Sequence, residues 1–95
     1  MKLENLRIEM DEIDGEIIRL LNDRAKIARK IGVVKAQAGL PIVDLDREAA
    51  ILRRVCAENN ENLTSDALER IYKRIITESR RLQVENVGKL AEIYQ

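Results

Sequence analysis

A single apolar seam through the N-terminal part of the chain constrains the fold more than any other feature. Positions 3, 6, 10, 13, 17, 20, 24, 27, 31, 34 and 38 alternate steps of three and four, and all but position 24 carry Leu, Met, Ile, Val or Ala. This spacing is typical of one face of an α-helix. We therefore expect a helix from about Lys2 to about Ala38, ended by Gly39 and Pro41.

A helix of this length does not fit inside a compact domain of 95 residues. About 37 residues at 1.5 Å each give roughly 55 Å, whereas a compact chain of this size has a radius of gyration of about 12 Å. The helix would project with its seam exposed, so we expect a homodimer with intertwined, antiparallel long helices. Gly15 and Gly32 lie inside this helix, where each costs up to about 1 kcal/mol relative to Ala. We expect close packing at both.

Two further helices are expected after the long one. Asp44 is a candidate N-cap for a second helix that runs to about Glu58. A polar loop separates it from a third helix, which begins at Thr64 or Ser65, both good capping residues, and continues to about Ile93. Strong helix formers dominate and β-rich signals are missing, so the sequence predicts an all-α fold with three helices per chain.

Composition limits the classes of function. Residues 1–95 are expected to form a single domain. The chain has 17 Lys and Arg against 17 Asp and Glu, and the lack of a basic excess disfavours nucleic acid as a partner. No apolar run is long enough for a membrane span or a signal peptide, so we expect a cytoplasmic protein. Histidine is absent and Cys56 is the only cysteine, which excludes histidine-based triads and His- or Cys-rich metal sites.

Arg24 is the only charged member of the seam. Taking a guanidinium out of water costs several kcal/mol unless an anion meets it. The anion could be a carboxylate of the protein, with Asp14 and Glu78 as candidates, or it could be a ligand. Lys35 lies three helical turns further on, about 16 Å along the axis. Both long side chains can face the same side and grip one small anionic molecule.

Polar residues also interrupt the faces of the other two helices. Ser79 and Gln83 lie one turn apart in an apolar stripe of the third helix, where they could form hydrogen bonds between helices or contact a ligand. Arg47 in the first turn of the second helix is unfavourable for the helix dipole, so we expect it to point at something negative. Taken singly, Arg47, Glu48 and Arg7 would be ordinary surface residues, and only their joint pattern suggests a site.

In order and spacing, these residues resemble a known family, the all-helical chorismate mutases. The resemblance runs from about Leu6 to Gln83. It rests on Leu6-Arg7 with Ile13-Asp14, Leu20-Leu21 with Arg24, Gly32-Val33-Val34-Lys35, Pro41-Ile42-Val43-Asp44-Leu45-Asp46-Arg47-Glu48, and Ile75-Ile76-Thr77-Glu78-Ser79 with Gln83. No single segment is specific, but together they are.

The resemblance implies a dimer with two sites, each of which takes one arginine from the partner subunit. The implied substrate-binding residues are Arg7, Arg24, Lys35, Asp44, Arg47, Glu48, Ser79 and Gln83, and of these Lys35, Gln83 and Arg24 are catalytic. The arginines would bind the substrate carboxylates, with Arg7 reaching across from the other chain and Ser79 orienting one carboxylate. Lys35 and Gln83 would bond the ether oxygen of chorismate. Glu48 and the backbone near Asp44 would hold the ring hydroxyl.

The activity implied is that of an isomerase, the conversion of chorismate to prephenate in phenylalanine and tyrosine biosynthesis. This rearrangement is unimolecular, so no cofactor and no metal are expected. An isochorismate-pyruvate lyase on the same scaffold is an alternative, although Glu48 and Ser79 together look more like the mutase pattern. A non-catalytic dimeric helical module, such as a ligand sensor, is another. The chain could also be the mutase domain of a fused aromatic-pathway enzyme.

Overall fold

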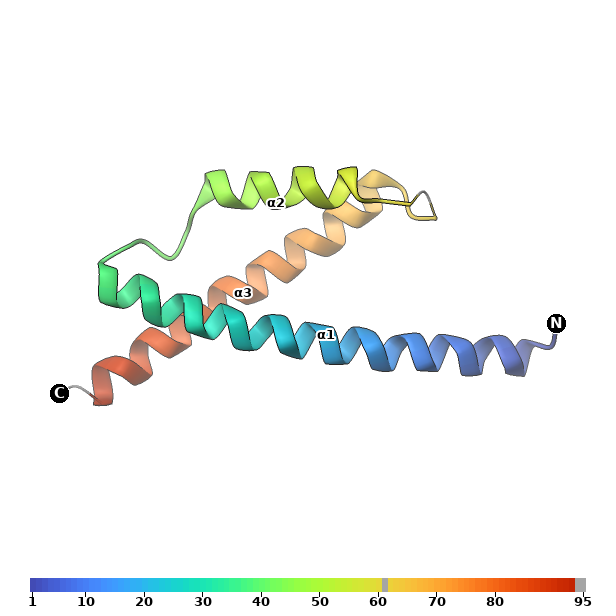
Figure 1. Ribbon diagram of the computed structural model, residues 1–95, viewed down its shortest axis with the longest axis horizontal. Helices are drawn as coiled ribbons and strands as arrows, with labels where there is room; N and C mark the ends of the chain where they lie inside the picture. The colour runs from blue at the N-terminus through green and yellow to red at the C-terminus, as the bar shows by residue number, and fades with distance from the viewer. Residues whose placement is uncertain (61, 94–95) are drawn as a thin grey trace.

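The computed structural model describes residues 1–60 and 62–93, with side chains as far as residue 85, and consists of three helices. These are α1 (Leu3–Ala38), α2 (Leu45–Ala57) and α3 (Ser65–Ile93) (Figure 1). The predicted all-α fold with three helices is confirmed. No helix within the described ranges has an apolar stretch that could cross a membrane.

The end of α1 shows why the chain turns where the sequence predicts. Gly39 adopts a left-handed conformation with φ 68°, which glycine reaches without a steric penalty. The backbone N–H of Leu40 then donates to the carbonyl of Lys35 over 2.8 Å. Because this bond closes the last turn and Pro41 cannot continue a helix, the chain leaves α1 and runs back toward α2.

Side-chain caps begin the other two helices. Asp44 precedes α2 in an extended conformation, and its Oδ1 accepts from the backbone N–H of Arg47 over 3.0 Å. Thr64 Oγ1 accepts from the backbone N–H of Ala67 over 3.1 Å at the start of α3. Each cap satisfies a backbone donor that has no partner within the helix. Asp44 and Thr64 are therefore the caps, as expected.

The three helices do not form a closed bundle. α3 crosses α1 in the C-terminal half of α1, and α2 packs on α3 (Figure 1). The crossing is tight at Gly32, where an added Cβ would lie 2.7 Å from the backbone oxygen of Gln83 and 2.8 Å from its Cα. Close packing at Gly32 is thus confirmed. At Gly15 a Cβ would meet no described atom within 4 Å beyond the adjacent backbone of its own helix, so the same expectation is not met within the described part of the chain.

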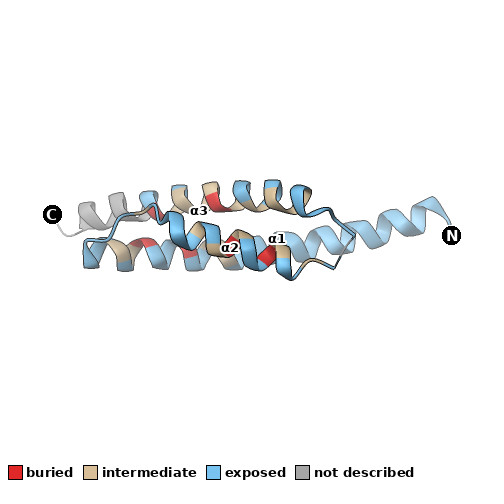
Figure 2. Ribbon diagram, turned by 90° about the horizontal axis from the view of Figure 1, so that it is seen from above, coloured by how far each residue is buried: buried red, intermediate tan, exposed pale blue. Residues whose placement is uncertain are grey.

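The buried core is small and lies around α3. Its members are Ala28, Ile51, Val55 and Ile76. The N-terminal half of α1 projects from the rest of the molecule with exposed residues throughout (Figures 1 and 2). The radius of gyration is 17.0 Å, against about 12 Å for a compact chain of this length. The predicted projection of the long helix is confirmed, and the dimer that would cover it stays a prediction.

Candidate active site

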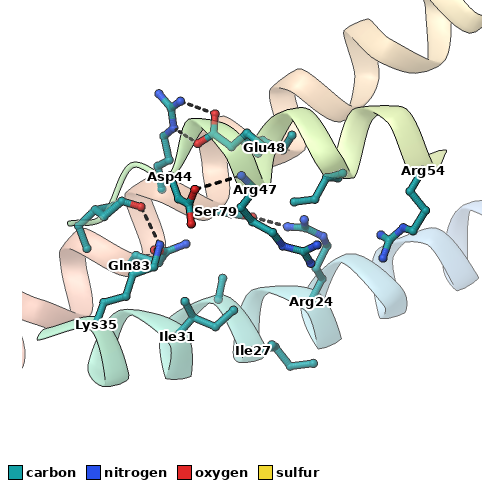
Figure 3. A pocket seen from close by; sticks show the side chains of 15 residues that line it. Arg24, Ile27, Ile31, Lys35, Asp44, Arg47, Glu48, Arg54, Ser79 and Gln83 are labelled. Carbon is teal, nitrogen blue, oxygen red and sulfur yellow. Dashed lines mark hydrogen bonds and ion pairs between the residues drawn. The ribbon is translucent and has the colours of Figure 1, made fainter. Parts of the chain in front are cut away.

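A cavity of about 330 Å³ lies between α2, α3 and the C-terminal half of α1 (Figure 3). This volume is at the lower end of the range for small-molecule sites. Seven of the eight predicted site residues line it: Arg24, Lys35, Asp44, Arg47, Glu48, Ser79 and Gln83. The apolar part of the lining includes Ile27, Ile31, Ile51 and Ile76. Among the described residues, no cluster of three or more Asp, Glu, His or Cys side chains is placed to hold a metal ion.

The Arg24 side chain enters the cavity from α1 and forms a hydrogen bond with a neutral group. Its Nη1 donates to Ser79 Oγ, and the Ser79 hydroxyl donates in turn to the carbonyl of Ile75 over 3.0 Å. Glu78, one candidate partner, pairs instead with arginines of its own helix. Within the described part of the chain no carboxylate forms an ion pair with Arg24. Arg24 therefore forms no ion pair with Asp14 or Glu78 of its own chain, the two candidates from the sequence, and the anionic-ligand alternative remains.

Lys35 and Gln83 meet at the other end of the cavity. Lys35 Nζ donates to Gln83 Oε1 over 3.0 Å and to the carbonyl of Ile42 over 2.7 Å. An ammonium has three protons, so one proton of Lys35 is left for a ligand. The Gln83 oxygen accepts from Lys35, which leaves the amide NH₂ group of Gln83 to donate to a ligand. The Lys35 ammonium and the Gln83 amide are thus two hydrogen-bond donors on the same wall of the cavity. Gln83 is only 8% exposed, so it is shielded from solvent.

Glu48 is held by a residue that the sequence analysis did not predict. Both oxygens of Glu48 accept from Arg80 of α3, Oε2 from Nε over 2.7 Å and Oε1 from Nη2. The hydrogen bond to Glu48 is the main cause of the raised pKa of Arg80. Burial lowers this pKa in part, and the charge of Glu48 adds a still smaller increase. Arg80 lies four residues after Ile76 and three before Gln83, a helical spacing that could have placed it on the same face.

Three guanidinium groups point into the cavity. Arg47 and Arg54 enter from α2, and Arg24 enters from α1 (Figure 3). None of the three forms an ion pair with a carboxylate of the described residues. Arg54 was also missed, although it follows Arg47 by seven residues, which is two helical turns. Guanidinium groups bind carboxylates with matched, two-pronged geometry, so the cavity is suited to a ligand with carboxylate groups.

Arg7 is the predicted site residue that the fold does not bring to this cavity. It is exposed on the projecting half of α1 and lies about 25 Å along the helix from Arg24. This separation agrees with the expectation that Arg7 cannot serve the site of its own chain.

Residues 6–84 match the family described as chorismate mutase type II. The chain belongs to this family. The resemblance to the all-helical chorismate mutases is thereby confirmed, and it extends over α1, α2 and most of α3. The cavity residues of this chorismate mutase family member all fall within the matched range.

Named relatives agree with the family. The bifunctional chorismate mutase/prephenate dehydratase of Aquifex aeolicus is 44% identical over 80 residues, which cover 80% of this chain and 22% of the relative. The chorismate mutase of Thermus thermophilus (form II) is 31% identical with a TM-score of 0.85, over 87% of this chain and 94% of that chain. The chorismate mutase of Helicobacter pylori in complex with prephenate is 35% identical with a TM-score of 0.83, over 90% and 93%. The chain thus spans nearly all of both solved structures and 22% of the curated relative.

Proposed function

We propose that this chain catalyses the rearrangement of chorismate to prephenate, as an isomerase of aromatic amino acid biosynthesis. The observation that carries the proposal is the arrangement of two kinds of polar group at opposite ends of one cavity. Arginines without a carboxylate partner among the described residues lie at one end, and the Lys35–Gln83 donor pair lies at the other. Membership of the chorismate mutase type II family supports the same reaction.

The arginines would select and fold the substrate. Chorismate is a flexible dianion that reacts only in a compact, chair-like shape. Arg24 and Arg47 would bind its carboxylates, with Ser79 orienting one of them through its bond to Arg24. Holding the two reacting ends together removes the need for a search through many conformations. This can lower the activation free energy by several kcal/mol.

Lys35 and Gln83 would stabilise the charge that develops as the reaction proceeds. The C–O bond of the ether breaks while a new C–C bond forms, so negative charge grows on the ether oxygen. Donors that already point at the ether oxygen do not have to move when the negative charge develops there, so they stabilise the transition state without a reorganisation cost. Lys35 is held by Ile42 and Gln83, which supports this role. Glu48 and the backbone near Asp44 would accept a hydrogen bond from the ring hydroxyl.

We also propose that the active form is a homodimer. An apolar groove between α1 and α3 has a volume of about 520 Å³ and borders on Arg24 and Ser79. Its walls include Ile17, Leu21 and Ile75. α1 of a second copy is suited to fill the groove, because its own exposed seam needs an apolar partner. Such packing would bring Arg7 of the partner subunit toward the cavity.

The first experiment is to incubate the purified protein with chorismate, and separately with isochorismate, and to identify the products. We expect prephenate from chorismate without added cofactor. Pyruvate and salicylate from isochorismate as the dominant reaction would instead assign the chain to the lyases. Binding of chorismate without turnover of either compound would favour a ligand-sensing module.

Turnover of chorismate should persist through neutral pH. The Gln83 amide donates its hydrogen bond whatever the pH, whereas a carboxyl group in its place would have to be protonated. The measurement is a pH profile of kcat/KM for the wild-type protein. A steep loss between about pH 6 and 8 would contradict the role of Gln83, because a titrating group would then control the step.

Arg7→Ala and Arg24→Ala subunits should restore activity when they are mixed. In a heterodimer of the two variants, one site contains neither substitution and the other contains both. Random exchange of equal amounts should therefore recover about one quarter of the wild-type activity, while each variant alone is nearly inactive. The measurement is turnover after mild denaturation and refolding of the mixture, with light scattering to establish dimers. Recovery no greater than the sum of the two variants would contradict a site shared between subunits.

A further inference from the structure

The acidic and basic residues around the cavity are paired very differently. Glu48 and Asp44 are the two acids of the lining, and both have partners. Arg80 bonds both oxygens of Glu48, and Asp44 Oδ1 accepts from the backbone N–H of Arg47. The guanidinium groups that point into the cavity have no carboxylate partner among the described residues. The charge of Glu48 is thus compensated by Arg80, and the Asp44 oxygen is used as a helix cap, whereas positive charge is left for a ligand.

From this pattern we infer that Arg80 is a positioning residue for the reaction and acts through Glu48. Arg80 holds the Glu48 carboxylate in the orientation in which it accepts a hydrogen bond from the ring hydroxyl of chorismate. Arg80 also offsets the negative charge of Glu48, which would otherwise repel a dianionic substrate. This inference depends on the proposed function, because it assumes that chorismate occupies the cavity.

The geometry of the pair supports both parts of this role. The two hydrogen bonds run from two different nitrogens of one rigid guanidinium to the two oxygens of one carboxylate. A two-pronged pair fixes the plane of the carboxylate, which a single bond would not. Each carboxylate oxygen can accept more than one hydrogen bond. Glu48 can therefore keep Arg80 as a partner and still accept from a hydroxyl in the cavity.

The location of the pair explains why its charge matters. The Glu48 side chain is 19% exposed and the Arg80 side chain is 37% exposed, so Glu48 is the more enclosed member. α2 supplies Glu48 and α3 supplies Arg80, so the pair also joins the two helices beside the cavity. Without Arg80, the carboxylate would face a substrate of the same sign at short range, and repulsion of this kind weakens binding.

Arg80→Met should raise KM for chorismate about tenfold and leave kcat within about twofold, because the ring hydroxyl contact is the same in the ground state and the transition state. Arg80→Lys should fall between the wild type and Arg80→Met, because it keeps the charge but loses the two-pronged geometry. The matched control is Arg81→Met. Arg81 is the next residue, its side chain is 64% exposed, and it pairs with Glu78 outside the cavity, so KM should stay unchanged.

A double-mutant cycle separates this role from a general effect on stability. Glu48→Gln removes the charge that Arg80 compensates, so adding Arg80→Met to it should change KM by less than about twofold. An equal, tenfold effect of Arg80→Met in both backgrounds would overturn the inference, and so would a KM for Arg80→Met equal to that of Arg81→Met. If circular dichroism shows that Arg80→Met is unfolded, the KM of Arg80→Lys decides in the same way. Lack of turnover in the wild type would overturn the proposed function and this inference together, whereas wild-type turnover with an unchanged KM in the Arg80 variants would overturn this inference alone.

Discussion

Lys35→Ala should lower kcat for chorismate by at least about 10²-fold while the protein stays folded. Removal of one donor aimed at a developing oxyanion costs about 10²–10³ in rate in other enzymes. The Lys35 ammonium carries a full charge and is held beside Gln83, so its loss should be at the upper end of this range. The measurement is steady-state turnover of chorismate, with circular dichroism to compare helix content.

Lys30→Ala is the matched control for this substitution. Lys30 lies on the same helix, is exposed, and does not line the cavity. It should therefore leave kcat unchanged. Lys35→Ala also removes the partner of the Gln83 oxygen, and an unpaired buried oxygen costs about 1–3 kcal/mol. Some loss in thermal stability is thus expected. Turnover of Lys35→Ala equal to that of Lys30→Ala would refute the assignment of Lys35.

Gly32→Ala should destabilise the protein and reduce its activity together. The new Cβ would lie 2.7 Å from the backbone oxygen of Gln83. The obstructing atoms belong to the backbone and cannot rotate away, so α1 and α3 must move apart. Overpacking of this kind costs about 1–3 kcal/mol, which is reduced by the better helix propensity of Ala. We expect a net loss of up to about 2 kcal/mol in the free energy of unfolding, measured by urea denaturation.

The loss of activity should exceed what the lower stability explains. Lys35 and Gln83 sit on the two helices that Gly32 holds together, and displacement of catalytic groups by about 1 Å can cost 10²-fold in rate. Gly15→Ala is the control. It lies on the same helix, away from the apolar seam, and a Cβ there would meet no described atom within 4 Å beyond the adjacent backbone of its own helix. It should leave activity unchanged and raise stability by about 0.5–1 kcal/mol. A fully active, equally stable Gly32→Ala protein would contradict this account of the crossing.

Local features of the fold were predictable because their causes are local. The seam of apolar residues predicts α1, and Gly39, Asp44 and Thr64 end or begin helices through contacts with residues no more than five positions away. The odd position of Arg24 in the seam indicated an anion site. The joint pattern of site residues then pointed to the family, which the match over residues 6–84 confirmed.

The contacts between helices were not predictable in the same way. The sequence left open whether Arg24 pairs with Glu78 or with a ligand, and it did not single out Arg80 or Arg54. Arg80 meets Glu48 across 32 residues. Such a contact depends on the course of α2 along α3, which is set by packing between residues that are distant in the sequence.

The sequence by itself determined the three helices, their ends, the excess length of α1 and the residue types suited to an anionic substrate, because hydrophobic periodicity and capping act over one or two turns. Only the tertiary structure decided which of those residues share a cavity and how their charges are paired. Side chains from three helices can meet only after the angles and distances between the helices are set, and these depend on the fit of whole surfaces.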